Sequence, residues 1–357
     1  MQKTPLYNEH TDRGAKVVDF NGWALPVQFA GIVKEHLHTR AKASLFDCSH
    51  MGEYHIHGQE AIERYDREIT SNVEKIPVGR CRYGTILSET GGILDDLITF
   101  RMAEDELYIV TNAGPLEAVT QRFCEDNPGA EHVSYETAKI DVQGPNARNI
   151  LLQAGFDAAE TLKYFNAVWT EWKGERILLS RTGYTGELGY ELYMPNDLAP
   201  DMWNMFLAFD DLEPAGLGAR DTLRLEVGYP LSGQDFDDQV TPLDAGMNSF
   251  IAWDTDFVGK AALEAQRERD DFSAFVGIKS TDRRAPRHGF EVYAEDKVVG
   301  TVTSGTFGPS LGHGIGLARL ERSHAARGTR LTAGPKRMPI EIAAVPIYTA
   351  GTCRVKI

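Results

Sequence analysis

One change of hydrophobic periodicity restricts the fold of this chain more than any other sequence feature. Before about residue 270, segments with apolar residues at three-to-four spacing alternate with short strand-like segments. From residue 275 onward, glycines separate short β-type segments. The longest stretch without Asp, Glu, Lys or Arg, residues 298–318, contains six glycines and one proline. This composition is unlike that of a membrane helix, which needs about 20 predominantly apolar residues. The sequence therefore predicts an α+β body followed by an all-β C-terminal module.

The α+β body contains several segments with clear helix or strand signals. Helices are predicted at residues 32–44, 61–71, 116–124, 145–154, 202–209 and 220–228. Strands are predicted within residues 46–58, 85–112, 138–142 and 167–181. A charged helix at residues 260–270 is expected to link the body to the β module. A chain of 357 residues is long enough for two or three domains, at roughly 100–200 residues each.

Charge and cysteine content exclude several classes of protein. The net charge is −15, so binding to duplex nucleic acid, which needs a basic face, is not expected. The four cysteines are far apart and form no C-x-x-C pair, so we expect free thiols in a reducing compartment. The N-terminal residues lack the apolar segment of a secretory signal. We therefore expect a cytoplasmic protein that binds neither membranes nor nucleic acid.

Two motifs resemble a dinucleotide-binding loop and a metal site, but their sequence context argues against both functions. The glycines of residues 312–316 resemble a dinucleotide loop, but they lie in the β module rather than between a strand and a helix. His55 and His57 share one strand face, but no third metal ligand is apparent nearby. We therefore predict no metal site.

The strongest catalytic candidate lies in residues 91–112. The polar middle of this segment predicts a hairpin with a loop of about five residues, in which Arg101 pairs with Leu107. Because strand side chains alternate between faces, Asp95 then points to the opposite face from Asp96. One face then carries Asp96, Ile98, Phe100, Tyr108, Val110 and Asn112. Desolvation at the end of this apolar stripe would raise the pKa of Asp96 and make it a competent base, although the residue could also merely close a turn.

Two further segments suggest ligand contacts. In residues 181–193, three glycines allow a flat ligand to approach the backbone, Tyr184 could stack on a ring, and Glu191 could accept two parallel hydrogen bonds from a heterocycle. The alternative is an ordinary hairpin with a solvent-facing glutamate. In residues 216–226, Arg220 and Arg224 share a face near a helix start, where Arg220 could clamp a carboxylate. The alternative here is a salt-bridged surface helix.

Taken together, ten ordered motifs resemble one family, the T-proteins of the glycine cleavage system, which are tetrahydrofolate-dependent aminomethyltransferases. The matching segments are residues 4–7, 18–23, 46–53, 91–96, 142–145, 181–187, 216–221, 233–235, 257–260 and 303–307. The family departs from this chain at Cys48, where an aliphatic residue is usual, and in the tail, residues 348–357.

The resemblance implies a three-domain cloverleaf around a central folate site. The implied domain 1 comprises residues 1–50 and 136–250 and is α+β. Domain 2 comprises residues 51–135 and has an antiparallel sheet with helices. Residues 251–270 form a linker, and domain 3, residues 271–357, is expected to be a β-barrel or a jelly-roll-like fold.

The resemblance also implies the reaction and its residues. The lipoyl arm of the partner H-protein carries an aminomethyl group, and the one-carbon unit passes to tetrahydrofolate with release of ammonia. Asp96 falls on the catalytic carboxylate of the family, and Glu191 falls on the pterin-binding glutamate. The remaining implied folate-binding residues are Tyr83, Asn112, Tyr184, Arg220 and Arg354.

Two alternatives to this activity remain open from the sequence. A folate-dependent demethylase would share the fold and the folate site but use another donor. A non-catalytic folate-binding protein would not need Asp96. Because the chain is acidic, docking of a partner would need a local basic patch, and residues 283–288 (RRAPRH) are the best candidate.

Overall fold

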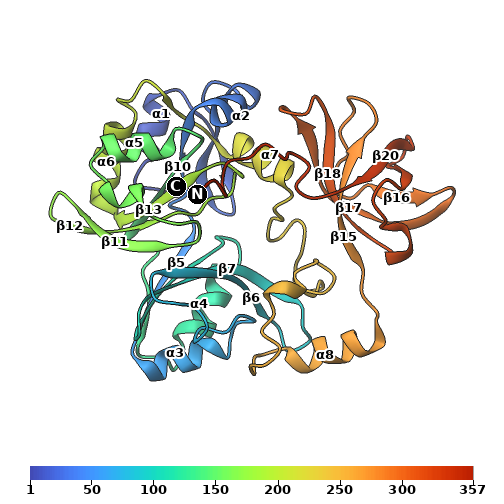
Figure 1. Ribbon diagram of the computed structural model, residues 1–357, viewed down its shortest axis with the longest axis horizontal. Helices are drawn as coiled ribbons and strands as arrows, with labels where there is room; N and C mark the ends of the chain where they lie inside the picture. Colours follow the sequence, from blue (N-terminus) through green and yellow to red (C-terminus); the bar gives the residue numbers. More distant parts are fainter. Residues whose placement is uncertain (357) are drawn as a thin grey trace.

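The α+β body forms two lobes and the β module forms a third, in the computed structural model of residues 1–356 (Figure 1). Residue 357, the last of the expected third domain, lies outside the described residues. In spatial order, the six-stranded sheet of the first lobe consists of β11 (Ala167–Trp172), β12 (Glu175–Ser180), β13 (Gly189–Pro195), β10 (Thr137–Gln143), β4 (Ala43–Asp47) and β14 (Leu212–Pro214). A smaller sheet beside it consists of β1 (Gln2–Lys3), β3 (Trp23–Gln28) and β2 (Lys16–Phe20).

The other two lobes are built from antiparallel strands. The second lobe contains a five-stranded sheet in the order β6 (Arg80–Leu87), β7 (Ile93–Ala103), β8 (Glu106–Thr111), β5 (Gly52–His57) and β9 (Ala130–His132). The third lobe is a closed barrel in the order β15 (Ala274–Ser280), β18 (His313–Leu320), β17 (Lys297–Gly308), β16 (Glu291–Ala294), β19 (Arg330–Ala333) and β20 (Met338–Ala343). The predicted α+β fold with an all-β C-terminal domain is therefore confirmed, and that domain is a closed barrel.

Eight α-helices complete the described chain. They are α1 (Tyr7–Asp12), α2 (Ile32–Ala41), α3 (Gln59–Asp66), α4 (Leu116–Cys124), α5 (Ala147–Gln153), α6 (Ala199–Phe206), α7 (Leu217–Val227) and α8 (Lys260–Arg269). Helix α3 ends earlier than predicted, because the Asp66 carboxylate accepts a hydrogen bond from the Val73 amide and Ile69 already pairs with Ile86 of β6. No helix among residues 1–356 is long and apolar enough to cross a membrane.

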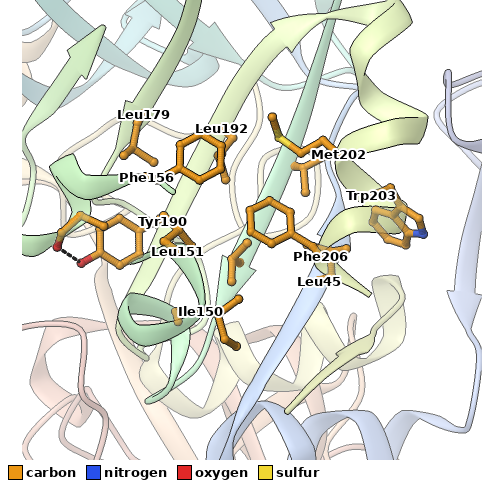
Figure 2. Packing of buried hydrophobic residues seen from close by; sticks show 14 of the residues in the cluster. Leu45, Ile150, Leu151, Phe156, Leu179, Tyr190, Leu192, Met202, Trp203 and Phe206 are labelled. Carbon is orange, nitrogen blue, oxygen red and sulfur yellow. Dashed lines mark hydrogen bonds between the residues drawn. The ribbon is translucent and has the colours of Figure 1, made fainter. Parts of the chain in front are cut away.

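The six-stranded sheet buries its largest apolar core on the face that α5 and α6 cover. Alternate residues of β10 and β13, such as Ile140 and Leu192, pack under helices α5 and α6. Figure 2 shows this core, in which Trp203 and Phe206 of α6 lie near Leu45 of the sheet. Because strand side chains alternate, the opposite face of β10 and β13 carries the polar residues that the site uses.

A long irregular segment returns from the first lobe to the second. After α7, apolar residues that include Phe236, Val240 and Leu243 pack with Leu87 and Ile93 at the turn between β6 and β7. Helix α8 then leads to the barrel (Figure 1). This packing places the start of β7 against residues 237–240, while the division of the chain into three domains with the expected boundaries stays a prediction.

The C-terminal tail leaves the barrel and returns to the first lobe. The Tyr348 amide donates to the carbonyl of Glu226 at 2.7 Å, and the Cys353 amide donates to the carbonyl of Gly186 at 3.1 Å. The tail therefore joins the third lobe to the first.

Candidate functional site

A cavity of about 1800 Å³ lies between the lobes. Its wall includes residues from the strands of the first two lobes, from α7, from the irregular segment that follows α7 and from the C-terminal tail. Every predicted site residue lines it, namely Tyr83, Asp96, Asn112, Tyr184, Glu191, Arg220 and Arg354. Residues that are up to 271 positions apart in the sequence (354 − 83) therefore share one wall.

The β7–β8 hairpin has the register that the sequence predicts. Arg101 pairs with Leu107, while the strands extend further than expected and leave only residues 104–105 as the turn. Along β7, residue exposure alternates, with Asp95 fully buried and Asp96 lining the cavity. The two adjacent carboxylates thus point to different sides of the strand.

Asn112 binds both carboxylates, which corrects one expectation. Its Nδ2 donates to Asp96 Oδ1 at 2.6 Å and to Asp95 Oδ1 at 2.8 Å, and its backbone N–H donates to Asp95 Oδ2 at 2.9 Å. The interpretation that Asn112 shares a face with Asp96 alone is wrong, because the β7–β8 ladder ends at Leu97 and Thr111. Beyond that pair, the asparagine no longer follows the strand alternation.

Burial makes both aspartates weaker acids than usual. Desolvation raises the pKa of Asp96 to about 6, although hydrogen bonding from Tyr83 and Asn112 partly offsets it. Desolvation, together with the charge of Asp96, raises the pKa of Asp95 to about 7. The cavity wall therefore carries a carboxylate that can take up and release a proton near neutral pH.

Glu191 is buried and already has three protein partners. Oε1 accepts from the Lys139 ammonium at 3.0 Å, while Oε2 accepts from the Thr182 hydroxyl at 2.6 Å and the Tyr193 hydroxyl at 2.7 Å. Burial alone would raise the pKa of Glu191, but the Lys139 charge and these hydrogen bonds lower it. A carboxylate has about four lone-pair positions, so Glu191 keeps about one for a ligand. The expected pair of parallel hydrogen bonds is not free in this arrangement.

Arg220 and Tyr184 lie together on the cavity wall. The guanidinium of Arg220 lies 4.8 Å from the centre of the Tyr184 ring, and its Nη1 donates to Asp141 Oδ2 at 3.3 Å. The Tyr184 hydroxyl donates to the carbonyl of Pro230. Helix α7 is largely buried from Thr222 to Val227, so the alternative of a surface helix is wrong. Arg220 therefore forms an ion pair with a carboxylate of the protein itself.

Sequence reasoning missed Lys139 and Asp141. Lys139 donates to Asp141 Oδ1 at 2.6 Å, and both residues are buried on the polar face of β10. The register pairs Asp141 with Glu191 on β13. A signal was present, because two opposite charges two residues apart interrupt an apolar strand, which places them on one face next to each other.

The structure also locates the other candidates. Arg354 is exposed in the tail, at the cavity wall. In the candidate docking patch, residues 283–288, Arg284 pairs with Asp282 at 2.6 Å, whereas Arg287 is exposed and has no carboxylate within 4.0 Å among residues 1–356. Outside the cavity, His55 Nε2 lies 3.0 Å from Glu106 Oε1, so this histidine has a structural partner.

Comparisons with known proteins agree along the whole chain. The family described as GCVT N-terminal domain matches residues 6–255, and the glycine cleavage T-protein C-terminal barrel domain matches residues 274–349. An aminomethyltransferase from Halalkalibacterium halodurans is 38% identical over 98% of this chain and 99% of its own length. One from Saccharopolyspora erythraea is 40% identical over 97% of this chain and 98% of its own length.

A solved structure supports the same assignment. The glycine cleavage system aminomethyltransferase T from Bartonella henselae has a TM-score of 0.92 at 30% identity, covering 98% of this chain and 99% of that chain. The alternative of a folate-dependent demethylase is not favoured, because the curated relatives are named aminomethyltransferases. The chain therefore belongs to the glycine cleavage T-protein family of aminomethyltransferases.

Proposed function

We propose that this chain transfers a one-carbon unit from the aminomethyl-lipoyl arm of H-protein to tetrahydrofolate in the central cavity. Asp96 carries the proposal. It is a carboxylate on the wall of a large cavity, with a pKa raised to about 6 by burial and a fixed orientation on Asn112. The products are methylenetetrahydrofolate, ammonia and a dihydrolipoyl arm.

The cavity residues support binding of a large, flat, partly polar acceptor. The wall combines aromatic and aliphatic side chains with many charged and polar groups, which suits a ligand that has both a flat ring and polar edges. We assign Tyr83, Asn112, Tyr184, Glu191, Arg220 and Arg354 to binding of tetrahydrofolate. The donor is covalently carried by its partner, so we expect H-protein to dock transiently and to insert only its arm.

Asp96 supplies the chemistry that the acceptor needs. The aryl-linked nitrogen of tetrahydrofolate is a poor nucleophile, so it gains from a hydrogen bond to a carboxylate as the carbon arrives. Asp96 accepts that hydrogen bond and takes the N–H proton as the new C–N bond forms and the bond from the carbon to the protonated amine breaks, which releases ammonia. The second folate nitrogen then attacks the same carbon and expels the lipoyl sulfur, which takes up a proton. Its raised pKa matches this role, because a base works best when its pKa lies near the working pH.

Replacement of Asp96 by asparagine tests the proposal. Formation of methylenetetrahydrofolate and ammonia from aminomethylated H-protein should fall by about 10²–10⁴-fold at saturating folate, while folate affinity stays nearly constant. Asp95→Asn is the matched control, because Asp95 does not line the cavity, and it should lose less activity. An Asp96→Asn variant within threefold of the parent rate would contradict the role.

A further inference from the structure

Lys139 lines the cavity wall and makes two side-chain hydrogen bonds among residues 1–356. Its ammonium carries three protons, of which one goes to Asp141 at 2.6 Å and one to Glu191 at 3.0 Å. Only 1% of Lys139 is exposed, so water does not freely accept a hydrogen bond from the third N–H. The ammonium lies 5.6 Å from the centre of the Tyr193 ring, and both residues line the cavity.

Glu191 offers the complementary group beside it. Glu191 is 5% exposed. Its Oε2 accepts hydrogen bonds from Thr182 and Tyr193, and its Oε1 accepts one from Lys139. About one acceptor position therefore remains on Oε1, next to the free N–H of Lys139. Together, the two side chains present one donor and one acceptor, separated by the 3.0 Å of their own ion pair.

We propose that Lys139 and Glu191 jointly recognise a lactam edge, an N–H beside a C=O on a flat ring, and that Lys139 selects the 4-oxo form of the acceptor pterin. The ring N–H donates to Glu191, and the neighbouring carbonyl accepts from Lys139. This inference rests on the proposed function, because it assumes that tetrahydrofolate binds in this cavity. It replaces the two parallel hydrogen bonds to Glu191 that the sequence alone suggested.

The charges around the pair keep both groups in the required form. Burial would lower the pKa of Lys139, but the charges of Asp141 and Glu191 outweigh it and raise the pKa, so the donor stays protonated. Arg220 pairs with the other oxygen of Asp141. The four side chains Lys139, Asp141, Glu191 and Arg220 therefore form a cluster with no net charge, which allows them to remain ionised out of water.

A pair of ligands tests the proposal on the unmodified protein. In 4-amino-4-deoxytetrahydrofolate, the ring N–H becomes an acceptor and the carbonyl becomes an amino donor, so both hydrogen bonds are reversed. Calorimetry should show this ligand binding on the order of 10²-fold more weakly than tetrahydrofolate, because buried polar groups are left unpaired. Equal affinities would overturn the proposal and leave the proposed function standing. No binding of tetrahydrofolate at all would overturn both.

Variants then assign the discrimination to Lys139. Lys139→Met should reduce the affinity ratio of the two ligands by at least about tenfold, and Lys139→Arg should restore part of it. Because the single change leaves buried carboxylates unbalanced, the double variant Lys139→Met/Asp141→Asn, which keeps the cluster neutral, repeats the test. The control is Lys75→Met, since Lys75 also lines the cavity but pairs with exposed Asp254. If the double variant binds both ligands more weakly and keeps the parent ratio, Lys139 is only structural and the proposal fails.

Discussion

At the scale of single residues, the site depends on neighbouring carboxylates that burial separates into different roles. Asp95 is fully buried and holds Asn112 and the Ser232 hydroxyl, whereas Asp96 lines the cavity. Asp95 therefore positions the asparagine that orients Asp96. The pair is coupled, so its protons come off in steps that belong to both residues.

This coupling predicts the pH dependence of the reaction. The active form of Asp96 is the carboxylate, so turnover should be lost as pH falls through about 6 and should level off above about 7, the pKa values to which burial raises the pair. The measurement is kcat against pH at saturating substrates. Asp95→Asn should leave the acidic limb near pH 6, because burial, and not the charge of Asp95, raises the pKa of Asp96. A flat profile between pH 5 and pH 8 in the parent protein would contradict the assignment of Asp96. A carboxyl with a pKa of about 6 changes from mostly protonated to mostly ionised within about one pH unit on either side of that value.

The sequence predicted the residues that follow simple strand alternation and missed those that do not. Asp96 could be found because its face follows from the register of Arg101 and Leu107. The second contact of Asn112 could not, since it arises where the ladder ends. The ion pair between Glu191 and Lys139 also could not be predicted from the sequence. The two residues are 52 positions apart and come into contact only when β10 pairs with β13.

At the scale of elements, the turn between β6 and β7 sets the position of the catalytic strand. Gly92 touches the irregular segment so closely that a Cβ atom would lie 1.7 Å from the carbonyl oxygen of Asp238. Next to it, the Ile93 amide donates to the carbonyl of Val240 at 2.9 Å. Contacts across 146 positions (238 − 92) therefore fix the start of β7.

A methyl group at Gly92 should displace this contact. Gly92→Ala should destabilise the protein by about 1–3 kcal/mol, as overpacking does, and should lower kcat because Asp95 and Asp96 lie just beyond the turn. Urea unfolding and turnover measure the two effects. Gly114→Ala is the matched control, since its Cβ atom would meet only the Asn21 side chain, at 3.6 Å. If Gly92→Ala behaves like this control, the close contact does not position β7.

The predicted elements show where local signals suffice. The helices at residues 202–209 and 220–228 were placed three positions late, because α6 and α7 begin at Ala199 and Leu217. Periodicity marks the amphipathic part of a helix and misses a first turn with other contacts. In the irregular segment after α7, the apolar residues recur at no regular spacing. Its packing against the second lobe therefore could not be predicted from the sequence.

At the scale of the whole molecule, the chain is acidic, and attraction of a partner must come from local charge. The barrel patch, residues 283–288, is exposed at Arg287, while Arg284 is partly neutralised by Asp282. Reversal of both arginines to glutamate should raise the apparent KM for H-protein at low salt and less at high salt, because such charges act mainly on encounter rate. The control is Arg13→Glu, an exposed arginine of the first lobe. An unchanged KM at low ionic strength would place docking elsewhere.

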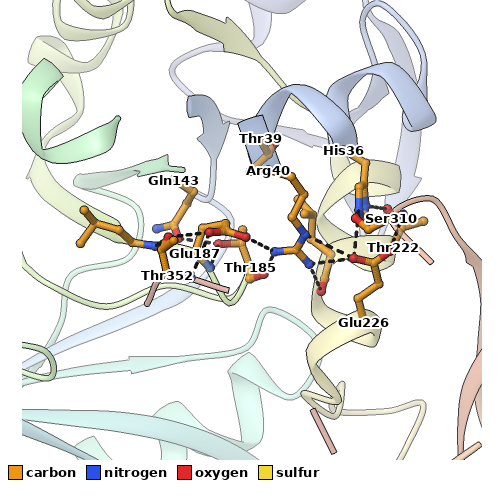
Figure 3. Close-up of polar contacts among 12 residues, drawn as sticks. His36, Thr39, Arg40, Gln143, Thr185, Glu187, Thr222, Glu226, Ser310 and Thr352 are labelled. Carbon is orange, nitrogen blue, oxygen red and sulfur yellow. Dashed lines mark hydrogen bonds and ion pairs between the residues drawn. The ribbon is translucent and has the colours of Figure 1, made fainter. Parts of the chain in front are cut away.

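The first and third lobes are held together by a buried polar network around Arg40 of α2 (Figure 3). The guanidinium donates to Glu187 Oε1 at 2.8 Å and to Glu226 Oε2 at 3.0 Å. The other oxygen of Glu226 accepts from the amide of Ser310 in the barrel, and the other oxygen of Glu187 accepts from the amide of Thr352 in the tail. Arg40 therefore neutralises the two carboxylates that hold the third lobe and the tail against the first.

Removal of Arg40 should loosen the molecule between its lobes. Arg40→Met leaves two buried carboxylates uncompensated, so the free energy of unfolding should fall by about 3–5 kcal/mol. The amides of Tyr348 and Cys353 should exchange with deuterium faster, because their acceptors Glu226 and Gly186 lie in or beside the network. The control, Arg284→Met, breaks only an exposed pair, which is worth roughly 0–1 kcal/mol, and should leave those amides protected. Slow exchange of both amides in a destabilised Arg40→Met protein would show that the network supports the first lobe alone, and that other contacts hold the tail in place.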